Sequence, residues 1–406
     1  MRTVGIVCEY NPFHTGHQRQ IDILHSMGYD CVVCVMSGNY TQRGELAIFD
    51  KYTRAESALL GGADLVLELP FPFSSLSAEG FANAGVYILA SLGVDAISFG
   101  SECGDIHLLC RAAETICSPE FASVYSELQL GGLGSAAAYF EAIKRISGED
   151  SSLLSNDILG ISYISAIKRQ NAALEIIPVK REGMAYNDEA LYPSAFPSAS
   201  ALRQTLKISH EALCDTLSGF VPEKSVLPLS NAKTEGLGPV YPSNIEKEII
   251  SFFRMLTPSE IIERAVSRSR GGDHIAEDGC GILERVCRTA KSADTIEYLL
   301  TNSYNSKYTD ARINRVILFS LFGVSDKLAR SLPKYTTLLG SNENGCMLLA
   351  QIRKSLTFNI VTKPADAPKG DPQTIISVAA DAMYSSAFPQ NKGSDYFFKK
   401  GPSILK

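Results

Sequence analysis

Short apolar runs alternate with longer amphipathic stretches along the first two hundred residues. Five runs of strand length are rich in Val and Ile: TVGIVCEYN (3–11), DCVVCVMSG (30–38), ADLVLELPF (63–71), VDAISFGSE (94–102) and LEIIPVKR (174–181). Each is almost continuously apolar, which is typical of strands buried on both faces of a parallel sheet. Helix-like stretches separate several of them, at 17–27, 51–62 and 79–93. The alternation predicts right-handed crossovers and a doubly wound α/β sheet.

Helical periodicity dominates the second half of the chain. It is clearest in SNIEKEIISFFRML (243–256), SADTIEYLLTNSY (292–304) and DARINRVILFSLFG (310–323). The last fifty residues are punctuated by Pro and Gly and give no clear pattern. We therefore expect two domains, a doubly wound domain over 1–206 and an α-rich domain over 207–406.

Length and composition indicate an ordinary soluble globular protein. The 406 residues are 45% hydrophobic and 20% charged. No apolar run approaches the roughly 18 residues that a membrane span needs, and the N-terminus enters a strand without a secretory signal. We expect a cytoplasmic protein that makes no membrane contact. The ten cysteines form neither a disulfide frame nor a zinc set, so free thiols and no metal site are expected.

The net charge of −6 is divided unevenly along the chain. Residues 1–205 hold 13 Lys and Arg against 23 Asp and Glu, a net charge of −10, and residues 206–406 hold 25 against 21, a net charge of +4. This mild asymmetry permits a nucleic-acid contact in the C-terminal half without requiring one.

The motif H-T-G-H, from His14 to His17, follows the first predicted strand and opens a predicted helix. A glycine at a helix start lets a phosphate approach free backbone N–H groups, and the helix dipole favours its charge. Imidazoles beside that point can donate to oxygens that become more anionic as the phosphates part. Neither the dinucleotide fingerprint nor the P-loop motif occurs in the chain. The motif resembles the H-x-G-H signature of nucleotidylyltransferases and class I aminoacyl-tRNA synthetases.

A second element, SASALRQ (198–204), combines small hydroxyl residues with Arg203 at a probable helix start. Ser198 or Ser200 is a plausible N-cap, and Arg203 could meet a triphosphate from the side opposite the histidines. It is similar to the I-S-x-T-x-x-R element of the same superfamily. The simpler alternative is an ordinary helix cap followed by a solvated arginine.

The wider sequence resembles one family closely, the bacterial tRNA(Met) cytidine acetate ligases. The motifs that carry the resemblance are VGIVCEYNPFHTGH (4–17), VMSGNYTQRGELAIFDKYTRAESALLGGADLVLELPF (35–71), FGSECGD (99–105), SNDILGISY (155–163), KREGMAYND (180–188) and SASALR (198–203). They cover the N-terminal half, and SKYTDARINRVIL (306–318) is the clearest counterpart in the C-terminal half. The resemblance implies a nucleotidylyltransferase (Rossmann-like) domain followed by the α-rich domain, which would bind tRNA.

The reaction that this resemblance implies is an ATP-dependent ligation. Acetate attacks the α-phosphate of ATP to give acetyl-adenylate and pyrophosphate, and the N4 amine of the wobble cytidine in elongator tRNA(Met) then takes the acetyl group and releases AMP. ATP is the substrate, with Mg²⁺ as a candidate counter-ion. Acetate and tRNA are the expected partners, and the oligomeric state is left open.

The resemblance also implies a set of site residues. The catalytic residues would be His14, His17 and Arg203. The ATP-binding residues would be Val7, Cys8, Glu9, Tyr10, Asn11, Pro12, Phe13, His14, Thr15, Gly16, His17, Gln18, Arg19, Gln20, Gly100, Asn156, Arg181, Glu182, Ser198 and Ser200. The sequence departs from the family pattern at Glu182, where an apolar residue is usual, and at Asn187, where a histidine is common. A role for residue 182 would therefore rest on its backbone.

Two further groups of residues are candidates for substrate contacts. Arg43 lies on the loop after the second strand and could steer acetate or a tRNA phosphate, or be a solvated loop arginine. The residues Glu45, Asp50 and Lys51 beyond it are expected to be structural. In the C-terminal half, we expect a tRNA-binding face made by Lys307, Tyr308, Arg312 and Arg315, with Ile313, Val316 and Ile317 facing the core. The alternative is an amphipathic helix with an ordinary solvated face.

Two other functions remain open on the sequence alone. One is a nucleotidylyltransferase that joins a nucleotide to a small metabolite, against which the extra two hundred helical and mildly basic residues argue. The other is a nucleotide-sensing or RNA-binding protein without turnover, which has little need for the His14 and His17 pair.

Overall fold

The computed structural model describes residues 1–148, 155–181, 198–208, 213–266, 279–304, 308–354 and 356–405. Its strands are β1 (Thr3–Cys8), β2 (Cys31–Ser37), β3 (Leu65–Leu69), β4 (Ala96–Ser101), β5 (Glu175–Lys180), β6 (Tyr335–Ser341), β7 (Asn359–Val361) and β8 (Ser403–Ile404). Its longer helices in the first half are α1 (Thr15–Ser26), α2 (Lys51–Leu60), α3 (Ala78–Leu92), α4 (Ile106–Cys117), α5 (Pro119–Leu130), α6 (Ser135–Ser147), α7 (Ser155–Gln170) and α8 (Ala199–Ile208).

The remaining α-helices belong to the second half of the chain. They are α9 (Leu213–Leu217), α10 (Glu223–Thr234), α11 (Glu246–Met255), α12 (Pro258–Val266), α13 (Gly279–Ala290), α14 (Ile296–Ser303), α15 (Asp310–Phe322), α16 (Asp326–Ala329), α17 (Glu343–Ile352) and α18 (Pro372–Ser386). Short 3₁₀ turns are η1 (Phe73–Ser75), η2 (Pro242–Ile245) and η3 (Pro364–Asp366).

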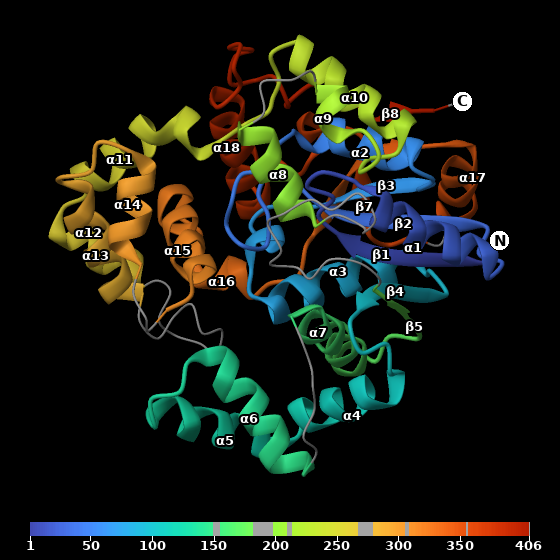
Figure 1. Ribbon diagram of the computed structural model, residues 1–406, viewed down its shortest axis with the longest axis horizontal. Coiled ribbons are helices and arrows are strands. Elements are labelled where there is room, and N and C mark those ends of the chain that lie inside the picture. Colours follow the sequence, from blue (N-terminus) through green and yellow to red (C-terminus); the bar gives the residue numbers. More distant parts are fainter. Residues whose placement is uncertain are drawn as a thin grey trace.

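The five predicted strands form the parallel part of one sheet, in the order β5-β4-β1-β2-β3. Helices lie on both faces of this sheet (Figure 1). The expected doubly wound arrangement is therefore confirmed. The strand order reverses direction at β1, between β4 and β2, and this is where such sheets open a crevice beyond the carboxyl ends of their strands.

Burial explains why β1, β2 and β3 read as continuous apolar runs, since every residue in the three strands is buried. Helix α3 packs closely on β1 because Gly85 presents no side chain there. A Cβ atom at Gly85 would lie 2.7 Å from the methyl groups of Val7. This close approach fixes the distance between α3 and β1, the strand that leads into the site.

The C-terminal half returns to this sheet, which the sequence pattern did not predict. Strand β6 pairs antiparallel with β3, and β7 and β8 pair parallel with β6. The sheet therefore crosses the expected boundary at residue 206, and residues 335–404 are not purely helical. Whether the chain divides into two folding units there stays a prediction.

Helices α11 to α15 form a group beside the sheet (Figure 1). On α15, the three predicted core positions Ile313, Val316 and Ile317 are buried, as expected. Among the described residues, no helix combines the length and apolar character that crossing a bilayer requires.

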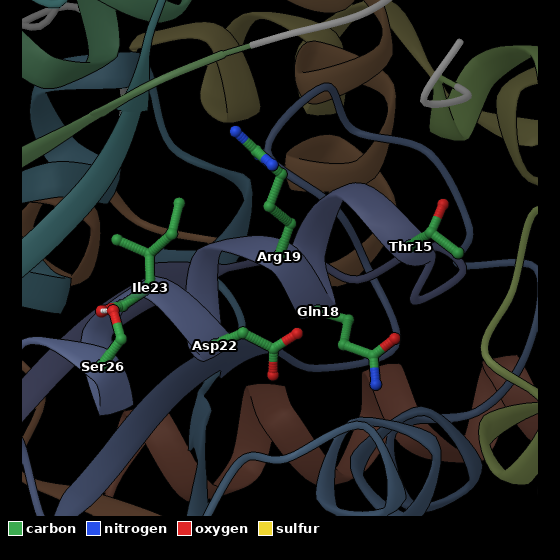
Figure 2. A pocket seen from close by; sticks show the side chains of 6 residues that line it. All are labelled: Thr15, Gln18, Arg19, Asp22, Ile23 and Ser26. Atoms are coloured by element: carbon green, nitrogen blue, oxygen red, sulfur yellow. Dashed lines mark hydrogen bonds between the residues drawn. The ribbon is translucent and has the colours of Figure 1, made fainter. Parts of the chain in front are cut away.

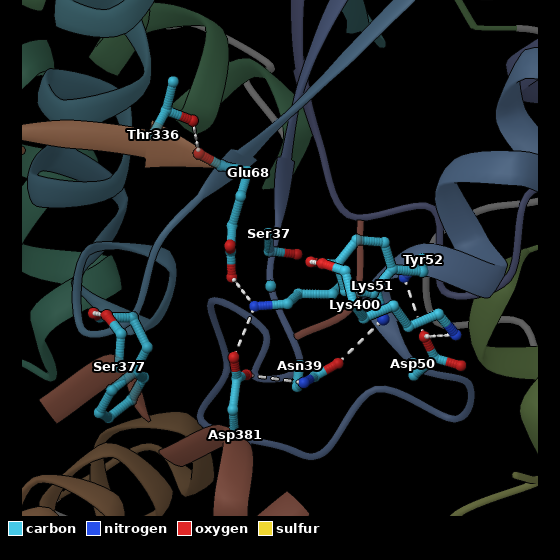
Figure 3. A network of polar contacts seen from close by, with 12 residues as sticks. Ser37, Asn39, Asp50, Lys51, Tyr52, Glu68, Thr336, Ser377, Asp381 and Lys400 are labelled. Atoms are coloured by element: carbon cyan, nitrogen blue, oxygen red, sulfur yellow. Dashed lines mark hydrogen bonds and ion pairs between the residues drawn. The ribbon is translucent and has the colours of Figure 1, made fainter. Parts of the chain in front are cut away.

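A buried charge cluster ties the last helices to the first half (Figure 3). The Lys51 ammonium lies 2.8 Å from a Glu68 carboxylate oxygen and 2.7 Å from an Asp381 oxygen. Asn39 donates to the other Asp381 oxygen over 2.8 Å, and its own carbonyl accepts from the Lys51 backbone N–H. The cluster is structural, as predicted for Lys51, and its partner on α18 is 330 residues away in sequence.

Burial and the neighbouring charges together set the pKa values of this cluster. Burial alone would lower the pKa of the Lys51 ammonium, but the carboxylates of Asp381 and Glu68 outweigh burial and raise this pKa. Burial raises the pKa of Asp381 to about 6, the Glu68 charge adds to this rise, and Lys51 and Asn39 act against it.

We predict that Lys51→Met destabilises the protein strongly, because it leaves two buried carboxylates facing each other. Breaking a buried pair in this way costs about 3–5 kcal/mol of unfolding free energy, which urea unfolding followed by circular dichroism would measure. The matched control is Lys168→Met, which removes the exposed ion pair with Glu114 and should change stability little. An unchanged unfolding midpoint for Lys51→Met would contradict this account.

Candidate functional site

A cavity of about 350 Å³ opens at the carboxyl ends of β1, β4 and β5. The residues that line it belong to the loops after these strands, to the start of α1 and to α7 and α8. The predicted site residues that line it are Val7, Cys8, Glu9, Tyr10, Asn11, His14, Gly16, His17, Arg19, Gln20, Arg43, Gly100, Asn156, Arg181 and Arg203. Segments far apart in sequence therefore meet where the sheet topology predicts a ligand.

The H-T-G-H motif forms the first turn of α1. His14 is the N-cap, and its Nδ1 accepts from the Gly16 backbone N–H over 3.1 Å. Nδ1 of His17 accepts in turn from the His14 backbone N–H over 3.3 Å, and the two rings stack 3.6 Å apart. Since each Nδ1 is an acceptor, each neutral ring carries its proton on Nε2. Both histidines are thereby set up as donors.

The environment keeps both rings neutral. Burial lowers the pKa of His14 to about 3, and the Arg181 charge adds to the effect. Burial lowers the pKa of His17 well below its ordinary value too, with contributions from His14 and Arg181. The first turn of α1 contains no acidic residue, so the helix N-terminus and two Nε2–H groups together favour an anion.

Tyr10 packs against this first turn of α1. Its φ of +46° places it in the left-handed region, which is uncommon for a residue with a side chain. The buried ring packs against Phe13 at 4.9 Å and against His17 at 4.7 Å. The left-handed backbone at Tyr10 thus places its ring in contact with His17. A residue with a side chain in this conformation often marks a functional site.

The opposite end of the cavity is made by β4, β5 and α7. Gly100 leaves room for the aliphatic stem of Arg181, whose Cγ would lie 3.3 Å from a Cβ at residue 100. Asn156 directs its amide N–H at a Glu102 carboxylate oxygen over 2.5 Å. Because Glu102 accepts from Nδ2, the Asn156 carbonyl oxygen is left as an acceptor for a ligand group.

Two carboxylates hold this end together: Glu102, one of the candidate residues that follow the fourth predicted strand, and Asp157, which the sequence reasoning did not single out. Glu102 accepts from the backbone N–H groups of Asn156 and Asp157 at the start of α7. Asp157 accepts in return from the backbone N–H groups of Glu102 and Cys103 and from the Ser101 hydroxyl. The signal in the sequence was a carboxylate directly after a strand, in FGSECGD, together with another opening a helix, in SNDILG.

Arg203 enters the cavity from α8, as predicted, and one of its Nη atoms donates to the Asn11 carbonyl over 3.0 Å. Its guanidinium also lies 4.0 Å from a Glu45 carboxylate oxygen. Ser198 caps α8, since its hydroxyl accepts from the Ala201 N–H over 3.0 Å. Neither Ser198 nor Ser200 is among the described residues that line the cavity.

Several residues of the predicted ATP-binding segment face elsewhere. Thr15 and Gln18, with Arg19, line a second and shallower pocket along α1 (Figure 2). Phe13 is fully buried in the core. Pro12 is not among the described residues that line the first cavity. Glu182 lies outside the described residues.

The loop after β2 forms the wall of the cavity that faces Arg203. Its Gln42 backbone N–H donates to a Glu9 carboxylate oxygen over 2.7 Å, and Gln42 and Arg43 both line the cavity. Gly44 has a φ of +74°, and a Cβ there would lie 2.7 Å from the Arg315 backbone nitrogen on α15. The loop therefore sits directly on α15.

This contact corrects the expectation for Arg315. Instead of sharing an exposed face with Arg312, its side chain is buried and donates to the Gln42 carbonyl over 3.3 Å. Arg312 is only partly exposed and lies over the Tyr308 ring at 4.8 Å. Lys307 lies outside the described residues. Arg315 is consequently a structural link between α15 and the loop that lines the cavity, and its role toward tRNA stays a prediction.

One buried guanidinium, also missed from the sequence, organises the ends of β1 and β2. Arg54 donates to the carbonyls of Glu9, Ser37 and Phe49 over 2.5, 3.0 and 2.9 Å, and also to the Gly38 carbonyl. Arg54 lies in the first turn of α2, which Asp50 caps. Nothing in the sequence around Arg54 indicates that its side chain points into the interior.

We predict that neither His14 nor His17 titrates between pH 5 and 8 in the free protein, and that both show the Nε2–H tautomer. The reason is that burial lowers both pKa values, so protonation begins only at lower pH. Long-range ¹H–¹⁵N correlation spectra of the imidazoles would test this. His25, which is half-buried outside the cavity, provides an internal reference. An imidazolium spectrum for His14 at pH 6 would contradict the prediction.

Comparisons with known proteins agree with this geometry. A family model described as HIGH Nucleotidyl Transferase matches residues 1–396. The tRNA(Met) cytidine acetate ligase of Acetivibrio thermocellus is 36% identical over 381 residues, covering 90% of this chain and 89% of that protein. The protein of the same name from Clostridium perfringens is 32% identical over 415 residues, covering 98% of each.

Two crystal structures of Thermotoga maritima TmcAL are similar over 100% of both chains. The apo form has a TM-score of 0.87 at 30% identity. A form bound with alpha-thio ATP has a TM-score of 0.85 at 29% identity. The resemblance drawn from the ordered motifs is thereby confirmed: the chain belongs to the HIGH nucleotidyl transferase family, among the tRNA(Met) cytidine acetate ligases.

Proposed function

We propose that this protein is an ATP-dependent acetate ligase that forms N4-acetylcytidine at the wobble position of elongator tRNA(Met). The observation that carries the proposal is the pair of neutral histidines at the start of α1, whose Nε2–H groups border a cavity at the switch point of the sheet. Family membership over nearly the whole chain supports it. The site of action would be the cytoplasm.

In this proposal ATP lies along the cavity. The adenosine rests at the end formed by Gly100 and Asn156, where the Asn156 carbonyl accepts a ligand hydrogen bond. The α-phosphate lies at the N-terminus of α1, and the Nε2–H groups of His14 and His17 donate to its oxygens as negative charge develops. Arg203 meets the triphosphate from α8 and helps pyrophosphate to leave.

Acetate then attacks the α-phosphorus, and acetyl-adenylate and pyrophosphate form. Arg43, on the wall near Arg203, is placed to attract the acetate anion or a tRNA phosphate. Among the described residues, no group of three or more His, Cys, Asp or Glu side chains is arranged to hold a metal ion. An Mg²⁺ ion that accompanies ATP would be held by phosphate oxygens and water, with at most one or two protein carboxylates, and it would neutralise phosphate charge.

The tRNA contacts of this proposal lie at the start of α15. Arg312 and the Tyr308 ring provide a charge and a stacking surface, with Lys307 beside them in sequence. Through the Arg315 contact with Gln42, this helix is joined to the cavity wall, so a tRNA held there would lie near the acyl group.

The test of the function uses the full chain with ATP and labelled acetate, with and without a transcript of elongator tRNA(Met). Acetyl-adenylate and pyrophosphate should form without tRNA, and AMP and acetylated cytidine should form when tRNA is added. A nucleotidylyltransferase acting on a small metabolite would give no acetylated tRNA. A protein that only binds nucleotide or RNA would release no pyrophosphate.

We predict that His14→Asn lowers the rate of acetyl-adenylate formation about 10²-fold or more, as the loss of a preorganised donor does. Asparagine keeps an oxygen that can cap α1 but has no group at the position of Nε2–H. Pyrophosphate release under saturating ATP measures the effect. The control is His25→Asn at the other end of α1, where both ring nitrogens face backbone carbonyls away from the cavity. If His14→Asn released pyrophosphate as fast as the control, the histidine would be a cap only.

A further inference from the structure

Glu9 is the one acidic residue among the described residues that line the cavity. It follows β1 directly and lines the cavity together with Gln42, Arg43 and Arg203. Its side chain is only partly exposed. A lone carboxylate is unexpected in a cavity that would hold the phosphates of ATP, because like charges repel there.

The protein holds this carboxylate firmly in place. One oxygen accepts from the Gln42 backbone N–H over 2.7 Å, and Gln42 is itself held by the Arg315 bond to its carbonyl. The backbone carbonyl of Glu9 accepts from Arg54 over 2.5 Å. The left-handed turn at Tyr10 follows immediately. Within the described parts of the chain, the Gln42 N–H is the hydrogen-bond donor to this carboxylate, and a carboxylate has acceptor capacity for further donors in the cavity that it lines.

The charges around Glu9 balance in a way that suits proton transfer. Burial raises the pKa of its carboxyl group, and the Glu45 charge adds to this. The Gln42 N–H, Arg203 and Arg54 act in the opposite direction. The net result is that the pKa of the Glu9 carboxyl group lies above that of an exposed glutamate, so its carboxylate is the more basic of the two.

We propose that Glu9 is the general base of the second half-reaction, taking the proton from the amine that attacks acetyl-adenylate. This inference rests on the proposed function. An exocyclic amine conjugated with a pyrimidine ring is a weak nucleophile, since its lone pair is delocalised, and it becomes strongly acidic as the new bond forms. Removal of its proton in the transition state is the step that a positioned base accelerates.

The amine nitrogen forms a bond to the acyl carbon, and its proton passes to a Glu9 carboxylate oxygen. The bond between the acyl carbon and the phosphate oxygen breaks, the electron pair stays on that oxygen, and AMP leaves. Glu9 returns its proton to water after the products depart, so no oxidant, reductant or further co-reactant is needed.

The histidines are poorly suited to this role. Their Nδ1 atoms already accept backbone hydrogen bonds, and their Nε2 atoms carry protons. A ring in that state donates but does not accept. The guanidinium groups of Arg43, Arg181 and Arg203 are donors without an acceptor. Burial raises the pKa values of Cys8, Tyr10 and Tyr163, which also line the cavity and so hold their protons more firmly. Glu9 is the one carboxylate on the described part of the cavity wall, and it offers the lone pairs that a base requires.

The test compares the two half-reactions in Glu9→Gln. Glutamine keeps an oxygen for the Gln42 N–H, so the wall should stay folded. Single-turnover transfer from preformed acetyl-adenylate to the tRNA(Met) transcript should fall at least about 10²-fold more than acetyl-adenylate formation does. The matched control is Glu45→Gln, which removes a nearby carboxylate that faces Arg203 but does not line the cavity. Its ratio of the two rates should stay within a few-fold of the wild type.

The pH profile gives a second readout. In the wild type, transfer should slow as pH falls through a pKa above the usual glutamate value, because protonated Glu9 cannot accept the proton. Glu9→Gln should lack this limb, and Glu9→Asp should keep it at a lower rate. Equal losses in both half-reactions, or an increased Mg²⁺ requirement for adenylate formation, would assign Glu9 to ATP or its metal ion and overturn the inference. If the wild type formed no acetyl-adenylate, the proposed function itself would fail.

Discussion

The Arg54 guanidinium is fully buried and donates to backbone carbonyls of Glu9, Ser37, Gly38 and Phe49. A charge in the protein interior is tolerated only when its donors find partners. The ends of β1 and β2 are therefore constrained to lie around one side chain from α2. The loops after β1 and β2, which supply Glu9, Gln42 and Arg43 to the cavity, start from this arrangement, so this part of the site depends on a residue that does not line it.

A second constraint joins the C-terminal half to the same wall. Gly44 reverses the loop after β2 and brings it against the backbone of α15, where Arg315 reaches back to the Gln42 carbonyl. The Gln42 N–H in turn orients Glu9. Gln42 is thus hydrogen-bonded on both sides. Its carbonyl accepts from Arg315 on α15, the helix proposed to receive tRNA, and its N–H donates to the Glu9 carboxylate in the cavity. Displacement of α15 would therefore reach Glu9 through Gln42.

Sequence patterns predicted the parallel strands and the location of the site because both depend on local features. Continuous apolar runs mark buried strands, and H-T-G-H follows the strand at which the sheet order reverses. Strand β6 escaped prediction because its antiparallel pairing with β3 is a long-range event with no local signature. Arg54 and Arg315 escaped for a related reason, since a cation on a helix is most often solvated and only tertiary contacts show that these two point inward.

The Lys51 cluster has a consequence for how the chain is made. Its ammonium belongs to an early helix, whereas the Asp381 carboxylate is synthesised 330 residues later. The edge of β3 likewise stays without its antiparallel partner until β6 has been synthesised. During translation the nucleotide-binding half therefore carries an interior cation that has Glu68 but still lacks its second carboxylate partner, together with an open strand edge, which is a hazard for aggregation. Completion of the catalytic half is tied to the end of synthesis, so a ribosome that stalls early releases a chain whose site is not yet assembled.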